Sequence, residues 1–417
     1  MVIQQKNWAG NLTYSAARLH YPKTVKEVQD LVKRSNKVRV LGSRHSFNDI
    51  ADTPEDHISL EHLDPGLIID RDQRMVTVAG GVRYGELCRI LHHEGFGLHN
   101  LASLPHISVA GACATATHGS GDQNGNLATA VSAMEIVTAD GEVVTLSRKS
   151  GSFSGAVVGL GGIGVVTSLT LDLLPAFDMQ QDVYENLPLA QLEGRFDDVS
   201  SSAYSVSLFT NWQGELINQV WLKRRITDRK IPSEPYFFGA TRATRKLHPI
   251  ATLSAEPCTE QMGVLGPWYE RLPHFRMDFT PSSGEELQSE YFVPREHAFD
   301  ALQAVQSTRE YIAPYLLISE IRTIAADNLW MSPCYQQTSV ALHFTWKLDW
   351  PAVRELLPLV EEQLAPFNAR PHWGKLFTMS PATLQSRYKK LQDFRDLLQQ
   401  FDPQGKFRNA FLDTYLF

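Results

Sequence analysis

The first regular pattern in the chain is a helical spacing of apolar residues between Thr24 and Asn36. These residues lie on one face of a helix when the period is 3.6. They are Val25, Val28, Leu31 and Val32. Thr24 and Glu27 also match a capping box, in which each side chain accepts a hydrogen bond from a free backbone N–H at the helix start. The pattern therefore predicts an amphipathic helix over residues 24–36.

Two short apolar runs that follow end at glycines and predict strands with tight turns. Val38–Leu41 leads directly into Gly42, and Met75–Val78 leads into Gly80 and Gly81. After the second turn, helical spacing returns over residues 84–93. The inner face of that helix is predicted to carry Leu87, Ile90 and Leu91. The amino-terminal part of the chain thus combines helices and strands, as in an α+β fold.

A third strand is predicted from the alternation over Val165–Leu173. Gly159, Gly161 and Gly164 precede it and match the G-x-G-x-x-G pattern, which normally opens a helix after a strand. Because β-branched residues typical of a strand follow these glycines, the pattern does not indicate a Rossmann site. The same polar alternation argues that the apolar stretch 155–174 is not a membrane span.

Beyond Pro175 the chain contains less glycine and more aromatic residues, which indicates a second domain. Residues 204–209 and 219–222 are predicted to be strands. The basic cluster Lys223–Arg225 that follows is interpreted as a solvated strand end, with a ligand-binding role as the alternative.

A further boundary is predicted at Pro366–Trp373, and a helical stretch follows over residues 381–400. These boundaries divide the chain into residues 1–175, 176–369 and 370–417.

Composition is that of a globular protein with room for a buried pocket. The chain has 417 residues, 43% hydrophobic and 20% charged, and a net charge of −7. This charge and the lack of a long basic run argue against nucleic acid as a partner. The cysteines have no paired spacing, and His92 and His93 are adjacent on a helix and point apart, so no metal site is predicted. Free thiols and an amino terminus without a signal peptide favour the cytoplasm.

Two further segments carry candidate chemistry. The run Ser108–Gly121 consists largely of small residues, so its backbone either approaches a diphosphate or forms a tightly packed turn in a core. Glu320 and Arg322 stand two apart in a strand-like stretch, so their side chains share one face. They either point into a pocket or form an ion pair on a solvated sheet face.

These segments resemble the vanillyl-alcohol-oxidase family of flavoproteins, and within it the aldonolactone and alditol oxidase branch. The resemblance covers nearly the whole chain, from Asn7 to Phe411. It is carried by the turn at residues 42–47, the segment 103–111, the pair Glu320 and Arg322, Thr345, and the string 371–375. It implies a two-domain α+β fold, with an FAD-binding domain over residues 1–175 and a substrate-binding cap domain, built on an antiparallel sheet, over residues 176–369. Residues 370–417 are then expected to return to the FAD-binding domain and to the active site.

The resemblance also implies how FAD would be held. His45 is expected to bond covalently to the flavin, Val165 to contact the adenine part, and His372 to lie near the isoalloxazine. The remaining expected cofactor-binding residues are Leu41, Gly42, Ser43, Arg44, Ser46, Phe47, Ser103, Ser108, Gly111, Thr115, Ala116, Thr117 and His118. Many relatives have glycine where this chain has Arg44, and arginine takes glycine-only backbone angles only with strain, so either the turn uses ordinary angles or its local geometry differs.

The activity implied is oxidation of the terminal hydroxyl of alditols such as xylitol and sorbitol, with oxygen as acceptor and hydrogen peroxide as product. Lys375 and Arg322 are the expected catalytic residues, and Ala102 is expected to control oxygen access. The expected substrate-binding residues are Ser103, Glu320, Arg322, Thr345 and Lys375. Alternatives are an aldonolactone oxidase or dehydrogenase of the same fold and a non-catalytic sugar-binding module. A monomer is expected, without a membrane partner.

Overall fold

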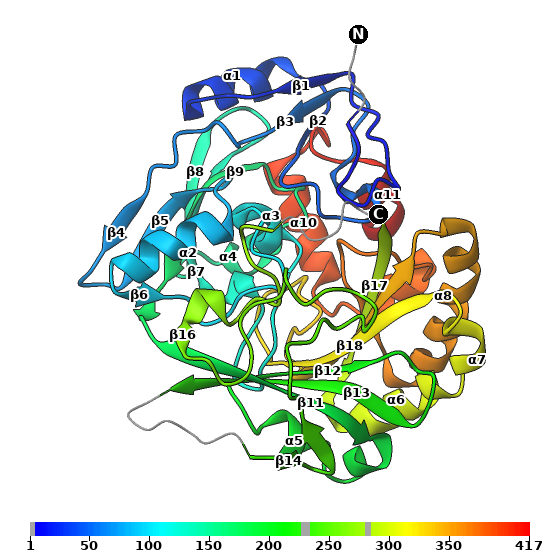
Figure 1. Cartoon of the computed structure of the whole chain (residues 1–417). Coiled ribbons are helices and arrows are strands. Elements are labelled where there is room, and N and C mark those ends of the chain that lie inside the picture. The colour runs from blue at the N-terminus through cyan, green and yellow to red at the C-terminus, as the bar shows by residue number, and fades with distance from the viewer. Residues whose placement is uncertain (1–4, 227–233, 280–284) are drawn as a thin grey trace.

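The computed structural model describes residues 5–226, 234–279 and 285–417. The amino-terminal part contains a small parallel sheet in the order β1 (Arg18–His20), β3 (Asp56–Ile58) and β2 (Val38–Val40). Helix α1 (Val25–Arg34) lies beside this sheet, and the Thr24 hydroxyl accepts a hydrogen bond from Glu27 N (Figure 1). The predicted first helix and its cap are therefore confirmed.

A second sheet in this part has five antiparallel strands. In spatial order they are β4 (Ile68–Asp70), β5 (Met75–Ala79), β9 (Val165–Asp172), β7 (Val131–Val137) and β8 (Val143–Ser147). The strand character of β9 confirms that the three upstream glycines do not open a helix. Strands β6 (Phe96–Gly97) and β10 (Leu174–Pro175) form a short separate pair.

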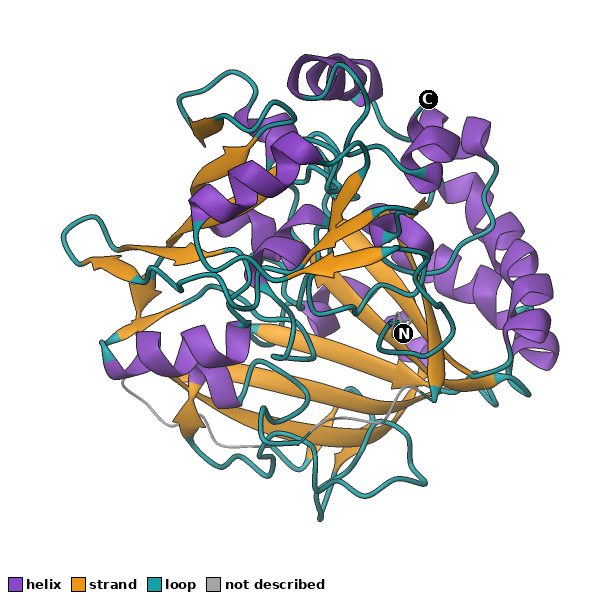
Figure 2. Cartoon of the chain, turned by 90° about the horizontal axis from the view of Figure 1, so that it is seen from above, coloured by secondary structure: helices purple, strands orange, loops and turns teal. Residues whose placement is uncertain are grey.

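The other large element is a ten-stranded antiparallel sheet. Its main path is β14 (Tyr236–Phe237), β15 (Ala240–Arg242), β11 (Asp178–Pro188), β13 (Leu216–Ile226), β12 (Ser205–Thr210), β18 (Leu316–Ile324), β19 (Ser339–Lys347), β17 (Glu286–Pro294) and β20 (Arg370–Pro371), and β16 (Gly266–Pro267) pairs with β11. Long strands run side by side across the molecule, and helices gather beside one end of them (Figure 2). Together the sheets and helices confirm the α+β class.

Helices connect and cover the two sheet regions. In chain order after α1 they are α2 (Tyr84–His93), α3 (Val109–Ala114), α4 (Phe153–Ala156), α5 (Phe196–Ser200), α6 (Ala298–Gln306), α7 (Arg309–Ile312), α8 (Trp350–Leu364), α9 (Pro381–Ser386), α10 (Leu391–Phe401) and α11 (Ala410–Leu416). Helices α10 and α11 pack on α4 and on the turn at Asp49–Ala51, so the end of the chain lies beside its beginning (Figure 1). The helices in the described part of the chain are too short or too polar to span a membrane.

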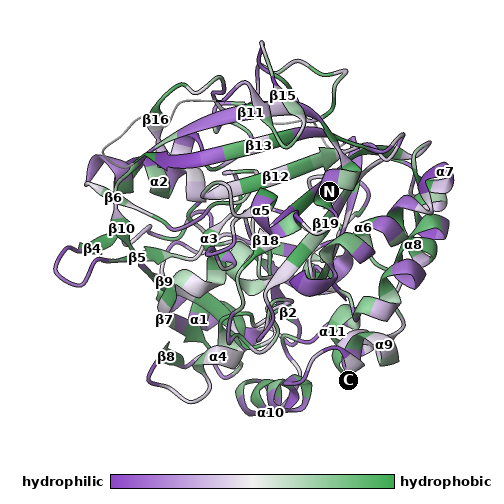
Figure 3. Ribbon diagram, turned by 90° about the horizontal axis from the view of Figure 1, so that it is seen from below, coloured by the Kyte–Doolittle hydropathy of each residue, from purple (hydrophilic) through white to green (hydrophobic). Residues whose placement is uncertain are grey.

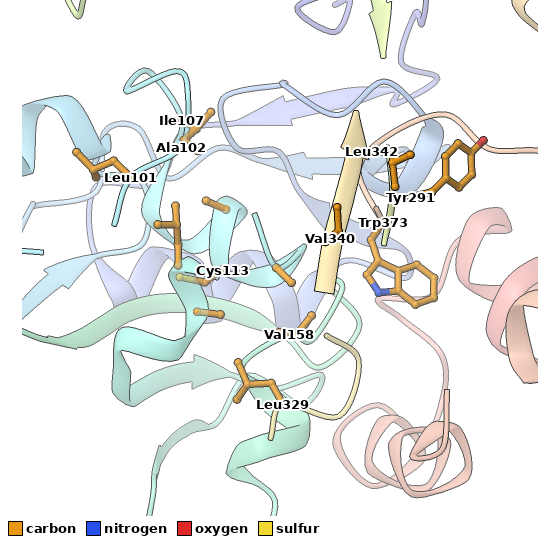
Figure 4. Packing of buried hydrophobic residues seen from close by; sticks show 14 of the residues in the cluster. Leu101, Ala102, Ile107, Cys113, Val158, Tyr291, Leu329, Val340, Leu342 and Trp373 are labelled. Atoms are coloured by element: carbon orange, nitrogen blue, oxygen red, sulfur yellow. The ribbon is translucent and has the colours of Figure 1, made fainter. Parts of the chain in front are cut away.

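A continuous hydrophobic core joins these parts. Cys113 of α3, Val340 and Leu342 of β19, and Trp373 near the carboxyl end belong to one buried cluster (Figure 4). Trp373 is fully buried, and its Nε1 donates to Met331 O at 2.7 Å. Coloured by hydropathy, α10 shows one apolar and one polar side, as expected for a helix that covers this core (Figure 3). The segment after β20 is therefore fixed by packing against both regions.

Three local predictions were wrong. Leu87 and Leu91 are buried on the inner face of α2 as predicted, but Ile90 is 44% exposed and Cys88 is buried in that face. The helical stretch at 381–400 is two helices, α9 and α10, with a turn between them. Lys223 is not solvated at a strand end: it is completely buried in β13.

Candidate active site

A cavity of about 680 Å³ extends from the amino-terminal part to the large sheet. At one end it is lined by residues 41–47 and by the start of α3, and at the other by side chains of β17, β18 and β19. Of the expected site residues, all but Ala116 and Val165 are among those that line it. Ala116 and Val165 are buried, and the Val165 side chain packs in a hydrophobic cluster with Val28 and Val137.

Residues 42–47 form a turn directly after β2. Arg44 adopts the left-handed conformation, with φ of 63°, which a residue other than glycine adopts at a cost of roughly 1–2 kcal/mol. Its carbonyl accepts from Trp8 N at 2.8 Å, and its Nη1 donates to Gln5 Oε1 at 2.7 Å. These contacts offset the strain. The expectation that the turn uses ordinary backbone angles is therefore wrong, because Arg44 itself adopts a glycine-type angle.

The next residue, His45, has the surroundings of a nucleophilic imidazole. Its ring stacks on Trp8 with centroids 5.4 Å apart and planes at 20°. Its Nδ1 is buried and has no hydrogen-bond partner in the described structure. Burial lowers the pKa of His45 to about 4, so the ring is neutral near pH 7. A neutral, desolvated ring nitrogen without a partner beside a cavity suits attachment to a group inside it.

Two glycines let the backbone pack closely against Ser108 in the wall of the cavity. A Cβ atom on Gly42 or on Gly111 would lie 2.8 Å from Ser108 Oγ. The Ser43 hydroxyl accepts from Ser108 N at 3.2 Å, and the Thr115 and Thr117 hydroxyls are 3.1 Å apart. The run from Ser108 therefore presents hydroxyls to the cavity, which fits the cradle interpretation better than that of a turn packed in a core.

A buried carboxylate, Glu290 on β17, organises the other end of the cavity. Its Oε1 accepts from Arg322 Nη2 at 2.6 Å and its Oε2 accepts from Lys375 Nζ at 2.7 Å. Burial alone would raise the pKa of Glu290, but the charges of Lys375 and Arg322 hold it well below its usual range. Glu290 thus carries a negative charge that holds both cations in place.

Glu320 and Arg322 both lie on the buried face of β18, with exposed fractions of 4% and 5%. The interpretation as a solvated surface pair is therefore wrong, and the shared pocket is correct. Glu320 Oε1 lies 2.7 Å from His274 Nε2 and 3.6 Å from Arg322 Nε. Burial would raise the pKa of Glu320, and the charge of Arg322 and the His274 contact lower it below its usual range.

On the neighbouring strand β19, His343 connects the remaining polar groups. Its Nε2 lies 3.0 Å from Thr345 Oγ1 and its Nδ1 lies 2.8 Å from Lys375 Nζ. Burial lowers the pKa of Lys375, and the charge of Arg322 adds to this effect while Glu290 opposes it. Ser103 Oγ lies 3.4 Å from Arg322 Nη1. The structure thus brings the expected catalytic and substrate-binding side chains together.

The segment that carries Lys375 is tied to the turn that carries His45. Phe47 N donates to Gly374 O at 2.8 Å. The Asn48 amide donates to Trp373 O and to Lys375 O, each at 2.8 Å. One main-chain hydrogen bond and the Asn48 side chain therefore hold the two segments together.

Replacing Asn48 with aspartate tests this connection. The carboxylate keeps the acceptor for Ile50 N but loses both N–H donors, so two main-chain carbonyls lose their partner. We expect the free energy of unfolding to fall by about 2 kcal/mol, measured by chemical denaturation. A change within about 0.5 kcal/mol, the range of ordinary surface substitutions, would contradict it.

Comparison with known proteins identifies the family. The alditol oxidase of a Streptomyces species is 52% identical to this chain over 413 residues, which cover 98% of each sequence. The chain belongs to the alditol oxidase family. A more distant relative is an L-gulono-1,4-lactone dehydrogenase of Mycobacterium tuberculosis, which is 27% identical to this chain, with 97% of each chain covered.

Two family models match parts of the chain, and a solved structure shares its fold. Residues 16–147 match the FAD binding domain, and residues 282–415 match the D-arabinono-1,4-lactone oxidase family. Cholesterol oxidase from B. sterolicum, 15% identical, has the same fold, with a TM-score of 0.82 and coverage of 99% of this chain and 96% of that chain. The expected FAD-binding flavoprotein fold is therefore confirmed.

Three residues of the site were not predicted from the sequence: Glu290, His343 and His274. His343 stands two before Thr345 on β19, so strand alternation gives the two residues one face. Glu290 and His274 offer no such signal. Glu290 follows other acidic residues, and His274 lies in a loop between Pro273 and Phe275.

Proposed function

We propose that this protein is an FAD-dependent oxidase that converts the terminal hydroxyl of an alditol, such as xylitol or sorbitol, to the aldose and reduces oxygen to hydrogen peroxide. The observation that carries this proposal is the pairing of Lys375 and Arg322 on the buried Glu290, in a cavity that also contains the His45 turn. The 52% identity to an alditol oxidase supports it.

FAD fits the residues of the other end. Gly42 and Gly111 let the backbone pack closely against Ser108 at the cavity wall, and the hydroxyls of residues 43, 115 and 117 supply donors for a diphosphate. We propose a covalent bond to His45, supported by its unpartnered buried Nδ1 and neutral ring. Bound there, FAD would supply an acceptor for the hydride of the alcohol and a route for the electrons to oxygen. Ala102 lines the cavity, and we propose it as the residue that controls oxygen access.

The substrate end suits an uncharged chain of hydroxyls. Glu320 and Arg322 are a buried acceptor and a buried donor, and Thr345 and Ser103 add hydroxyls that can do both. A site of this kind rejects analogues that leave its buried polar groups unpaired. We therefore assign these four side chains to the hydroxyls of the polyol, with Arg322 nearest the carbon that reacts.

Lys375 is assigned to the proton of the reacting hydroxyl. Its lowered pKa brings the ammonium closer to the working pH, where the lysine exchanges a proton more readily. In the ammonium form, Nζ contacts Glu290 and His343 and retains a third donor for the developing alkoxide. In both roles, as proton acceptor or as ammonium, Lys375 lowers the energy of the deprotonated alcohol while the hydride leaves the alcohol carbon.

The division into residues 1–175, 176–369 and 370–417 remains our proposal for the domains. It is supported by the position of the large sheet, whose strands run from Asp178 to Pro371. A monomer remains our proposal. The four cysteines are buried free thiols, which supports a reducing compartment such as the cytoplasm.

Product analysis tests the reaction type. The pocket offers neutral and charged donors and acceptors that suit the successive hydroxyls of a polyol. We therefore expect turnover of xylitol and sorbitol, with one hydrogen peroxide formed per aldose. L-Gulono-1,4-lactone should be a poorer substrate by kcat/KM. Peroxide assay with each compound, at equal enzyme, makes the comparison. Turnover of the lactone with none of the alditols would instead place the protein among the lactone oxidases.

A further inference from the structure

Lys223 is a buried lysine that the reaction as described does not use. It lies on β13 and is completely inaccessible to solvent. Its Nζ contacts Leu272 O at 2.6 Å, Pro273 O at 2.9 Å and His274 Nδ1 at 3.0 Å. In the described part of the chain, no carboxylate lies within ion-pair distance of Nζ. Since a buried ammonium without a carboxylate is costly, a specific use for this lysine is expected.

The contacts of Lys223 fix the protonation of His274. An ammonium group has three donors and no acceptor, and its three neighbours here are two carbonyls and a ring nitrogen. His274 Nδ1 must therefore accept, so the proton of the neutral ring lies on Nε2. Nε2 is 2.7 Å from Glu320 Oε1 and donates to it. Burial, with the Lys223 charge, lowers the pKa of His274 to about 4, which keeps the ring neutral.

We propose that Lys223 and His274 are positioning residues for Glu320. They keep one carboxylate oxygen of Glu320 hydrogen-bonded to His274, so that the other oxygen accepts a hydrogen bond from a hydroxyl of the polyol. In the described structure no hydrogen bond engages Glu320 Oε2, and Glu320 lines the cavity. This inference rests on the proposed function, because it needs a hydroxyl at that oxygen. It extends the substrate site to Lys223, which does not itself line the cavity.

The arrangement predicts that substrate affinity depends on pH. A neutral Lys223 amine has two N–H groups, which its two carbonyl partners accept, and a lone pair that faces His274 Nδ1. The ring then takes the other tautomer, and the lone pair of Nε2 faces the Glu320 carboxylate. Burial lowers the pKa of Lys223 to about 7. Polyol binding should therefore be tight below this pH and weaken as pH rises through it.

Other groups around Lys223 determine where it titrates. The Glu320 charge and the Cys258 thiol raise its pKa, and two guanidinium groups lower it. The titratable and charged groups that face Lys223 are His274, Glu320, Cys258, Arg322 and Arg271. Because Cys258 is buried and its pKa is raised to about 12, it stays neutral over this range. Lys223 is therefore the group expected to change charge near neutral pH.

The test measures xylitol affinity on the FAD-loaded enzyme. The dissociation constant comes from the substrate dependence of anaerobic flavin reduction, over a pH series that crosses neutrality. In the wild type it should increase as pH rises through neutrality. Lys223→Met should raise the dissociation constant of xylitol about tenfold at low pH, and this constant should no longer increase with pH. The limiting rate of flavin reduction should stay within about twofold of the wild-type rate. Lys347→Met, an exposed lysine on the same sheet, is the control and should behave as wild type.

A second pair of variants keeps the test decisive if Lys223→Met does not fold. His274→Gln retains a donor near the place of Nε2, whereas His274→Leu has none. The leucine variant should lose affinity and the glutamine variant should regain most of it. Wild-type affinity in both Lys223→Met and His274→Leu, or an unchanged pH dependence in Lys223→Met, would overturn the proposal. If Glu320→Gln binds xylitol with wild-type affinity, the proposed substrate-binding role of Glu320 fails. This result is distinct from a failure of the positioning role of Lys223 and His274, in which Glu320→Gln still loses affinity.

Discussion

Replacing Lys375 with methionine should lower the limiting rate of flavin reduction by about a hundredfold or more, with FAD retained. Loss of one charged contact to a developing oxyanion typically costs about 3 kcal/mol of activation energy. Lys375 contacts Glu290 and His343 inside the cavity, so methionine fills its volume without its charge or proton. Rapid mixing with saturating xylitol under anaerobic conditions isolates this step from oxygen and from product release.

Thr345→Val is the matched comparison for this prediction. Thr345 is assigned to a remoter hydroxyl, so its loss should raise the dissociation constant of xylitol and leave the limiting rate close to that of the wild type. Methionine at position 375 also leaves Glu290 with a single cationic partner, so the thermal midpoint must be measured for each variant. A Lys375→Met enzyme that is folded and reduces its flavin at the wild-type rate would remove Lys375 from the chemistry.

Much of the fold could be predicted because its signals are local. The first helix begins at a capping box and has a single apolar face, and the structure places it over Val25–Arg34. The pairing of Glu320 with Arg322 in one pocket follows from strand alternation, since residues two apart share a face wherever a strand forms. Strand alternation does not show whether that face is buried. It depends on the neighbouring strands β12 and β19, which lie far away in the sequence.

What could not be predicted depends on contacts between distant segments. Lys223 stands beside Arg224 and Arg225 and looks like part of a solvated basic cluster, but strand alternation turns its side chain into the core. The acceptors that stabilise it there belong to residues 272–274, about fifty positions later. Glu290 likewise has its two cations on β18 and in the segment after β20. No local pattern specifies either set of partners.

Replacing His45 with alanine should leave the protein without covalently bound flavin. The imidazole Nδ1 is buried without a partner beside the cavity, and alanine offers no atom to which the flavin can bond. After acid precipitation, wild-type protein should keep its yellow colour in the pellet, whereas the variant should release FAD to the supernatant or contain none. Absorbance of both fractions, and the mass of the denatured chain, measure the attachment.

Arg44→Gly is the control that separates loss of the bond from damage to the turn. It keeps His45 and supplies the residue that tolerates a φ of 63° without strain, so the covalent flavin should be retained. Its side-chain bond to Gln5 is exposed, so its removal should cost little stability. Loss of covalent flavin from Arg44→Gly would show that the bond depends on the turn and not on His45 alone, whereas release of flavin from the wild type on acid treatment would end the covalent assignment. The buried, neutral ring of His45 would then need another explanation, such as stacking between Trp8 and a flavin that is not bonded to it.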